Sequence, residues 1–319
     1  MAFSFTHIKN IRNLLQRFGL LVVILVIVAV MSLIKPVFLS GENILNVLRQ
    51  VSINGILAVG ITFVIMTGGI DLSIGSIVAV TAVLVGSFLE QGHSLVAAIT
   101  VGMIGAVLFG ILNGILISIS GLPPFIATLS NMTIARGAAM VYSNGRNYVI
   151  MHEKFLQIGK GYALGIPNPI WILLVVCVIA YVLLNYTIFG RHILAFGGNR
   201  HAAKLAGVRT KLVEASAYFI SGLLSGVAAI VLVSRTSTGQ PIAGTGYELD
   251  AIAAAAIGGT SMTGGSGSIG GTVMGFIIIG IMLNSLTLLN VSSFYQQIVK
   301  GIIIIVAVML DMQAKRRIS

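Results

Sequence analysis

The chain has 319 residues, of which 57% are hydrophobic and only 8% are charged, with a formal net charge of +11 at pH 7. A soluble globular domain carries about a quarter charged residues, so this composition excludes a protein whose main solvent is water. The basic charge does not indicate a nucleic-acid partner, because Lys and Arg stand in short clusters between apolar runs, as the orientation of membrane helices requires.

Apolar runs bounded by Gly, Pro or charge predict ten membrane spans, since a helix needs about 20 apolar residues to cross a bilayer. Six precede the main basic loop, near 18–34, 51–67, 72–89, 95–119, 124–142 and 169–188. Four follow it, near 212–233, 249–259, 270–289 and 295–311, the second of them short. We therefore expect an all-α polytopic protein in which residues 1–319 form one transmembrane domain. The 38 glycines favour closely packed helices, some of them broken.

Basic clusters set the expected orientation, because Lys and Arg concentrate in cytoplasmic segments. Three precede the first span, namely Lys9, Arg12 and Arg17, and three end the chain, namely Lys315, Arg316 and Arg317. Both termini are therefore expected in the cytoplasm. The first span resembles a signal peptide, but Lys35-Pro36 follows it in place of a small-residue cleavage site, so it is expected to stay uncleaved.

The loop at about 190–211 is also expected to be cytoplasmic, since it holds Arg191, Arg200, Lys204, Arg209 and Lys211. Within it, Asn199 and Gly207 predict the start and the end of a short exposed helix. Such a helix could enter a groove on a partner protein or could simply connect two spans at the membrane surface. The candidate contact residues are Gly198, Asn199, Ala202, Ala203, Leu205 and Gly207.

The segment at about 143–168 is the longest polar stretch, and the same topology places it on the outer side. It is either a docking surface or a plain solvated loop.

The chain also contains an internal repeat: Met-Thr-Gly-Gly occurs at 66–69 and again at 262–265, each time followed a few residues later by Ser-Ile-Gly. Helices broken at corresponding places are typical of a transporter pathway, although two Gly-rich loops can also resemble each other by chance. The six spans between the copies predict the same orientation for both.

Polar residues within the spans are candidates for the translocation pathway. Asp71 lies in the Gly-rich break at 67–75, where it either caps the next helix or takes part in gating or solute contact. The amides of Asn54, Asn113 and Asn284 are suited to sugar hydroxyls, and hydrogen bonds between helices are their alternative role. Asn131 and Gln297 share this ambiguity, and Arg136 and Lys300 are expected to snorkel or to pair.

No catalytic or metal-binding pattern occurs in the sequence. HExxH, CxxC and GxSxG are missing, and Gly159-Lys160 is followed by Gly161, not by the Ser or Thr of a P-loop. The five His residues are dispersed, and the single Cys177 lies in an apolar run, which indicates a packing role. We expect neither an enzyme nor a metal site nor a cofactor, and any ATP hydrolysis must occur in another chain.

Several motifs together resemble the permeases of ribose, xylose and galactose-type ABC importers along nearly the whole chain. They are Gly-Ile-Asp-Leu-Ser at 69–73, Thr-Ile-Ala-Arg-Gly at 133–137, the loop at 197–207, and Asp-Ala-Ile-Ala-Ala at 250–254 followed by Gly-Gly-Thr-Ser at 258–261. The runs at 244–250 and 291–300 resemble ribose permeases most.

This resemblance implies a bacterial inner-membrane subunit that passes ribose inward through a pair of such chains, either two copies or one copy and a sister permease. It also implies a cytoplasmic ATPase that binds ATP and Mg²⁺ and a periplasmic sugar-binding protein. Residues 198–207 would be the coupling helix. Another sugar or a sugar-like signal molecule remains an alternative. An ion-coupled secondary transporter is the other alternative, but it should carry paired acidic residues within spans, and only Asp71 and Asp250 fit. A purely structural scaffold would not need broken helices.

Overall fold

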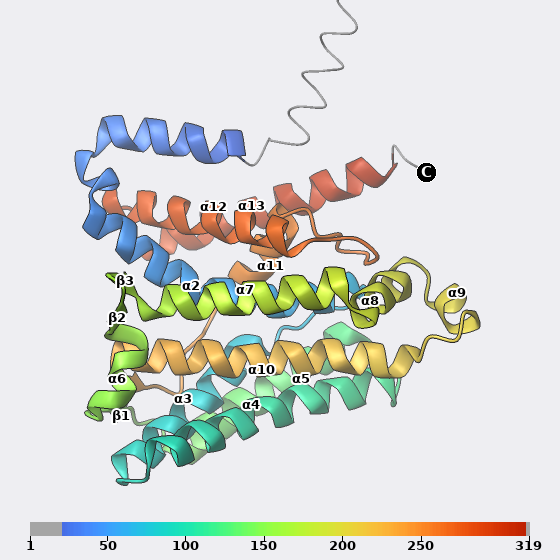
Figure 1. Ribbon diagram of the computed structural model, residues 1–319, viewed down its shortest axis with the longest axis horizontal. Coiled ribbons are helices and arrows are strands. Elements are labelled where there is room, and N and C mark those ends of the chain that lie inside the picture. The colour runs from blue at the N-terminus through green and yellow to red at the C-terminus, as the bar shows by residue number, and fades with distance from the viewer. Residues whose placement is uncertain (1–20, 317–319) are drawn as a thin grey trace, which may run out of the picture.

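The computed structural model describes residues 21–316, in which helices lie side by side in one bundle (Figure 1). The N-terminal cluster of Lys9, Arg12 and Arg17 lies outside the described residues, as do Arg317 and the side chains of Lys315 and Arg316. The orientation that these two clusters predict therefore stays a prediction.

The first half of the described chain consists of helices joined by short turns. They are a helix at Leu21–Ile34, the 3₁₀ turn η1 (Pro36–Leu39), α2 (Gly41–Met66), α3 (Ile74–Glu90), α4 (Leu95–Ser118) and α5 (Pro124–Ser143). The second half comprises α6 (Glu153–Lys160), α7 (Asn168–Tyr186), α8 (Ile188–Gly198), α9 (Arg200–Leu205), α10 (Thr210–Thr236), α11 (Tyr247–Ile257), α12 (Ile269–Leu288) and α13 (Ser293–Arg316).

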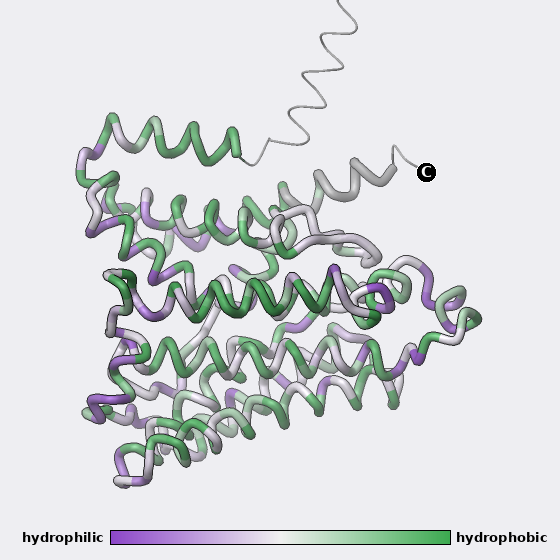
Figure 2. Tube along the Cα trace, viewed as in Figure 1, coloured by the Kyte–Doolittle hydropathy of each residue, from purple (hydrophilic) through white to green (hydrophobic). Residues whose placement is uncertain are grey.

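Five of these helices are long and apolar enough to cross a membrane: α2, α4, α7, α10 and α12. The other five expected spans also coincide with helices, namely Leu21–Ile34, α3, α5, α11 and α13. Apolar residues run along the helices, and hydrophilic residues gather at the two ends of the bundle (Figure 2). The polytopic helical membrane fold is confirmed, and the count of ten spans remains a prediction.

Small residues let the central helices approach closely. The Cβ that a side chain would add at Gly110 of α4 would lie 2.8 Å from the Tyr218 carbonyl oxygen of α10. A Cβ at Gly222 of α10 would lie 2.7 Å from the Cα of Gly110. Backbone contact of this kind replaces the hydrophobic drive that lipid does not supply, which confirms the packing expected from the glycine content.

The repeated motifs form two breaks, one between α2 and α3 and one between α11 and α12. Helices α2 and α11 pack together, and Asn54, at the middle of α2, bonds to Asp250 in the first turn of α11. Beyond their ends, the amide of Gly265 donates a 2.9 Å hydrogen bond to the carbonyl of Met66. Helices α2 and α11 therefore run in the same direction, as the repeat predicts, and the two breaks touch each other.

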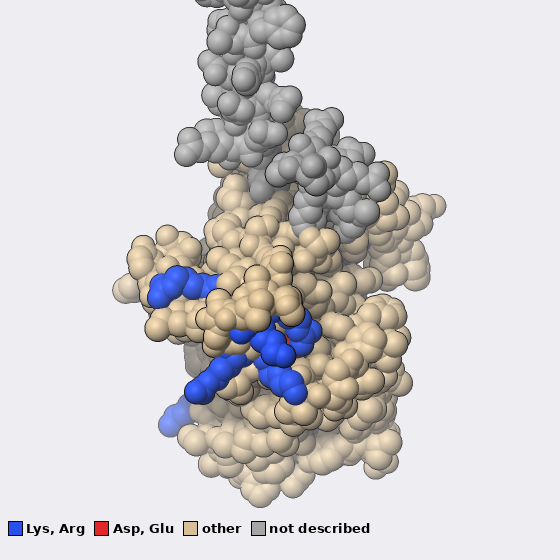
Figure 3. All heavy atoms as spheres, turned by 90° about the vertical axis from the view of Figure 1, so that its right-hand side faces the viewer, with Lys and Arg blue, Asp and Glu red and all other residues tan. Residues whose placement is uncertain are grey.

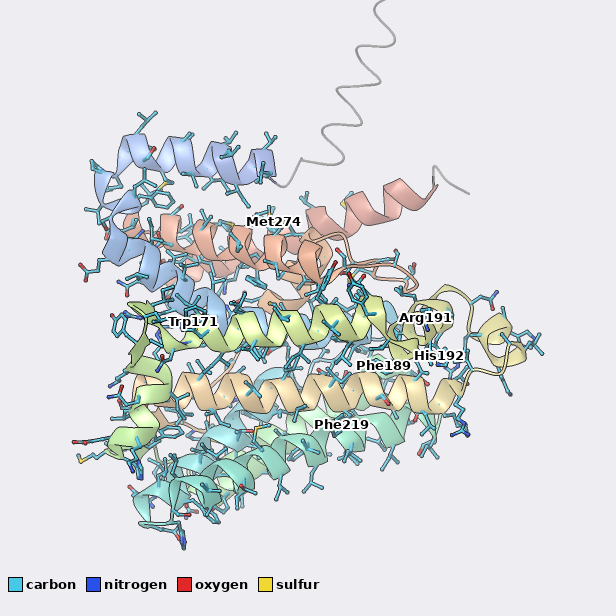
Figure 4. All side chains as sticks on the ribbon, viewed as in Figure 1. Trp171, Phe189, Arg191, His192, Phe219 and Met274 are labelled. Carbon is cyan, nitrogen blue, oxygen red and sulfur yellow. The ribbon has the colours of Figure 1, made fainter. Side chains whose placement is uncertain are left out.

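The segment at 143–168 is folded, not a plain loop. It contains α6 and three two-residue strands, β1 (Tyr148–Val149), β2 (Tyr162–Ala163) and β3 (Ile166–Pro167). Strand β1 pairs antiparallel with β4 (Thr238–Gly239), and β2 pairs antiparallel with β3. These strands are the one addition to the expected all-α class within the described chain. Trp171 marks this end of α7, and Arg191 and His192 lie beyond the opposite end of the helix (Figure 4).

Candidate coupling surface and buried polar clusters

Helices α8 and α9 form a hairpin at the basic end of the bundle. The sequence predicted α9 but not α8, because Gly190 and Gly197 resemble helix breaks. Both glycines instead allow close backbone contact, since a Cβ would lie 1.8 Å from the Leu184 carbonyl at Gly190 and 1.9 Å from the Met66 carbonyl at Gly197. The end of α8 therefore rests directly on the break that follows α2.

Helix α9 begins as predicted, because the Asn199 Oδ1 accepts a 2.9 Å hydrogen bond from the Ala202 amide. Its end is marked by Gly207 in the left-handed conformation, at φ +83°. Of the six candidate contact residues, five are exposed: Gly198, Asn199, Ala202, Leu205 and Gly207. Ala203 is only 5% exposed and packs within the chain, and its contact with a partner remains a prediction. The order of residues in so short a helix did not indicate which side faces inward.

An ion pair fixes the hairpin to α10. The guanidinium of Arg200 donates to both carboxylate oxygens of Glu214, at 2.9 and 3.4 Å, and lies over the Phe196 ring of α8. Because Glu214 is buried and Arg200 is half-exposed, this bidentate pair orders the base of α9 while its tip stays free.

The surface around α9 is strongly basic. A groove of about 660 Å³ between α9 and the start of α10 is lined by Arg200, His201, Lys204, Arg209 and Lys211, among others. Figure 3 shows Lys and Arg gathered over this end of the molecule. A second cleft, of about 380 Å³, runs from Gly198 and Arg200 to the α2 break at Thr67. The exposed hairpin, the basic groove and the breaks are thus continuous.

Asp71 and Asn113 belong to one fully buried cluster. The Asp71 carboxylate accepts hydrogen bonds from the Ser73 hydroxyl at 2.7 Å, the Ser221 hydroxyl at 2.7 Å and the Asn113 amide at 3.3 Å. Asn131 in turn donates to Asn113 at 2.8 Å. Asp71 also accepts from the Ser73 amide, so it supports the start of α3, although the cap position itself is held by Ser73. The cluster joins α3, α4, α5 and α10.

Asn54 and Asn284 lie elsewhere, each in a contact between helices. Asn54 donates to Asp250 at 3.4 Å, and Asp250 pairs with Lys300 at 2.8 Å, which confirms that Lys300 pairs. Asn284 exchanges two hydrogen bonds with Asn43, at 2.9 and 3.0 Å. The four expected pathway residues therefore occupy three separate places, and all four bond to other helices or turns. Their roles in transport remain predictions.

One polar site was not recognised from the sequence. Arg136 of α5 and Glu248 of α11 line a common cavity with Thr133 and Thr245. The sequence indicated Arg136 alone as a charge within a span, because Glu248 of α11 is far from α5 in the chain. The sequence contained one signal for this site: Arg136 lies within the expected span at 124–142, and Glu248 directly precedes the expected span at 249–259.

Residues 43–308 match the family described as the permease component of the branched-chain amino acid transport system. The chain belongs to this permease family. It is 47% identical over 301 residues to the ribose import permease protein RbsC of Bacillus subtilis, covering 94% of each chain. It is 43% identical to RbsC of Haemophilus influenzae, covering 91% of each. No solved structure matches the chain.

A further relative is the L-arabinose ABC transporter permease protein AraH of Azospirillum brasilense, at 39% identity over 94% of this chain and 88% of the relative. The resemblance to sugar permeases is therefore confirmed. Together with the apolar helices, it makes this chain a multi-pass permease of the inner membrane.

Proposed function

We propose that this chain is the membrane-spanning subunit of an ATP-binding-cassette importer that moves a monosaccharide, ribose, inward across the bacterial inner membrane. The names of the relatives favour ribose over arabinose, since the relatives of higher identity are ribose permeases. The observation that carries the mechanism is the α8–α9 hairpin, which is exposed at its tip and in backbone contact with the broken helices at its base.

The segment at 190–211 is the cytoplasmic coupling loop in this proposal. An ABC ATPase binds ATP and Mg²⁺ and receives α9 through the exposed Gly198, Asn199, Ala202, Leu205 and Gly207. The basic groove favours an acidic rim on that ATPase, because opposite potentials steer association. Closure of the ATPase then displaces the hairpin, and the hairpin moves the two breaks.

The proposed topology has ten spans with both termini in the cytoplasm. It follows from the Lys and Arg residues gathered at the hairpin end. The segments at the opposite end carry both signs of charge, including Glu90, Arg146, Glu153 and Lys154. The folded segment at 143–168 then faces the periplasm and receives the sugar-binding protein.

A second permease, either another copy or a sister chain, completes the pathway in this proposal. In the described chain α13 packs mainly on α11 and leaves Phe294, Ile298, Ile302 and Ile305 exposed. Lipid or the second permease covers this face.

Copurification with the ATPase tests the coupling surface. Leu205 and Leu164 are both highly exposed, at 78% and 91%, but lie at opposite ends of the bundle. Leu205→Asp should abolish copurification of an ABC ATPase encoded by a neighbouring gene, and Leu164→Asp should not affect it. Retention of the ATPase by Leu205→Asp would contradict the proposed role of α9.

A further inference from the structure

A cavity of about 380 Å³ lies between α5 and α11, away from the clusters described above. Most of its exposed lining is apolar and includes Met132, Met140 and Gly137. The polar side chains that also line it are Arg136, Glu248, Thr133, Thr245 and Ser76. It lies where two helices begin, because a Cβ at Gly75, near the start of α3, would collide with the carbonyl of Gly244, which precedes α11. Sites formed where interrupted helices begin are typical of transporter pathways.

Two opposite charges line this cavity without forming an ion pair. The Arg136 Nη1 donates to the carbonyls of Pro241 and Ala243, both at 2.9 Å, which fixes the guanidinium. The Glu248 carboxylate lies over Gly75, where a Cβ would come within 2.4 Å of Oε2. Among the described residues, the ion pairs are those of Arg146, Arg200 and Lys300, and none joins Arg136 to Glu248. The space between the two charges is open to a ligand.

The depth of the cavity shows what this face of the bundle contacts. Helix α5 has 20 residues, yet it is not among the five helices that are both long and apolar enough to cross a membrane. Arg136 lies twelve residues beyond Pro124, or about 18 Å along a helix of about 30 Å. Charged groups at this depth are costly against lipid and face a protein interior or a water-filled cavity. The α5–α11 face therefore does not contact lipid at this level.

We propose that this cavity is a sugar-contact site on the translocation pathway, a refinement that rests on the importer function proposed above. Glu248 accepts hydrogen bonds from sugar hydroxyls, and Arg136 and Thr133 donate to sugar oxygens. One positive and one negative charge leave the lining without net charge, which suits a neutral polyhydroxylated ring better than an ion. The volume lies within the roughly 300–1,000 Å³ range of small-molecule sites.

Thiol labelling tests whether the cavity holds water. Cys177 is the only cysteine, so Cys177→Ala provides a cysteine-free background for Thr133→Cys. Leu174→Cys, on the exposed apolar face of α7, is the matched control. A membrane-impermeant methanethiosulfonate reagent reacts with the thiolate, which forms only in water, so Thr133→Cys in the assembled importer should react at least about tenfold faster than Leu174→Cys. Equal, slow reaction at both positions would overturn the proposal.

Filling the cavity tests sugar contact itself. A Cβ at Gly137 has no heavy atom within 4 Å, so Gly137→Leu can occupy the space without displacing the chain. Ala138→Leu, exposed on the same helix and outside the cavity lining, is the control. In proteoliposomes containing ATPase and binding protein, Gly137→Leu should lower ribose uptake per ATP hydrolysed about tenfold, equal to about 1.4 kcal/mol in the barrier. Stimulation of ATP hydrolysis by the sugar-loaded binding protein should persist.

Transport by Gly137→Leu at the rate of Ala138→Leu would overturn the sugar-contact site. The two proposals fail separately. If the unmodified importer shows no ATP-dependent uptake of ribose, the proposed function fails, and the labelling of Thr133→Cys still decides whether the α5–α11 cavity holds water.

Discussion

The carbonyl of Met66 accepts a 2.9 Å hydrogen bond from the amide of Gly265, so the break after α2 is joined directly to the break before α12. Gly197, near the end of α8, lies against both residues, and a Cβ there would be 1.9 Å from the Met66 oxygen and 2.5 Å from the Gly265 nitrogen. Three segments distant in sequence therefore meet through their backbones. Displacement of the α8–α9 hairpin must move both breaks.

Adjacent glycines test this contact. Gly197→Ala should lower the free energy of unfolding by roughly 1–3 kcal/mol, because a methyl group must be forced into a closed backbone contact. Gly198→Ala is the control, since no atom lies within 4 Å of a Cβ at that position. Thermal unfolding of both variants in detergent measures the difference, and equal midpoints would show that the three segments do not meet as described.

The buried Asp71 cluster predicts an order of stabilities. Asp71→Ala leaves the hydroxyl of Ser221 and other donors unpaired, which costs about 1–3 kcal/mol for each buried group. Asp71→Asn keeps the shape and one acceptor oxygen, so its unfolding midpoint should lie between those of the unmodified protein and Asp71→Ala. Lost transport with unchanged unfolding midpoints would instead favour the gating role over the structural role of Asp71.

The Asp250–Lys300 pair should show strong coupling. Lys300→Met leaves the buried carboxylate of Asp250 without its cation and should destabilise the protein by about 3 kcal/mol. Adding Asp250→Asn to this variant removes the unpaired charge and should restore most of the loss in a double-mutant cycle. Arg146→Met is the control, because it breaks the more exposed pair with Glu90 and should cost at most about 1 kcal/mol. Additive effects of Lys300→Met and Asp250→Asn would contradict a direct pair.

The basic groove predicts that binding of the ATPase weakens with salt. Lys204→Gln with Lys211→Gln should weaken binding at low salt and flatten its dependence on ionic strength, since exposed charges are screened over about 10 Å at 0.1 M. Lys160→Gln, on α6 at the opposite end, should leave the salt dependence unchanged. Binding assays across a salt series measure both, and unchanged dependence in the double variant would exclude the groove from the interface.

The positions of the helices could be predicted from the sequence because apolar runs of span length have few other stable states. The N-terminal cap of α9 at Asn199 could also be predicted from the sequence, since capping depends on residues close together in the chain. Helix α8 was not, because a glycine required for close packing cannot be distinguished locally from a glycine that ends a helix.

The hydrogen-bond partners of the polar side chains within the spans were harder to predict from the sequence. The sequence identified the polar residues of the spans but not that Asn284 bonds to Asn43, or that Asn113 bonds to Asp71. Such pairs depend on which helices become neighbours. The cavity shared by Arg136 and Glu248 was missed for the same reason.

Uptake of labelled ribose into proteoliposomes tests the central claim most directly. The chain is reconstituted with its ATPase and binding protein, with and without Leu205→Asp. Uptake should require ATP and both partners, and Leu205→Asp should abolish it. Uptake by this chain alone, driven by an ion gradient and unaffected by Leu205→Asp, would contradict the importer assignment and establish a secondary transporter.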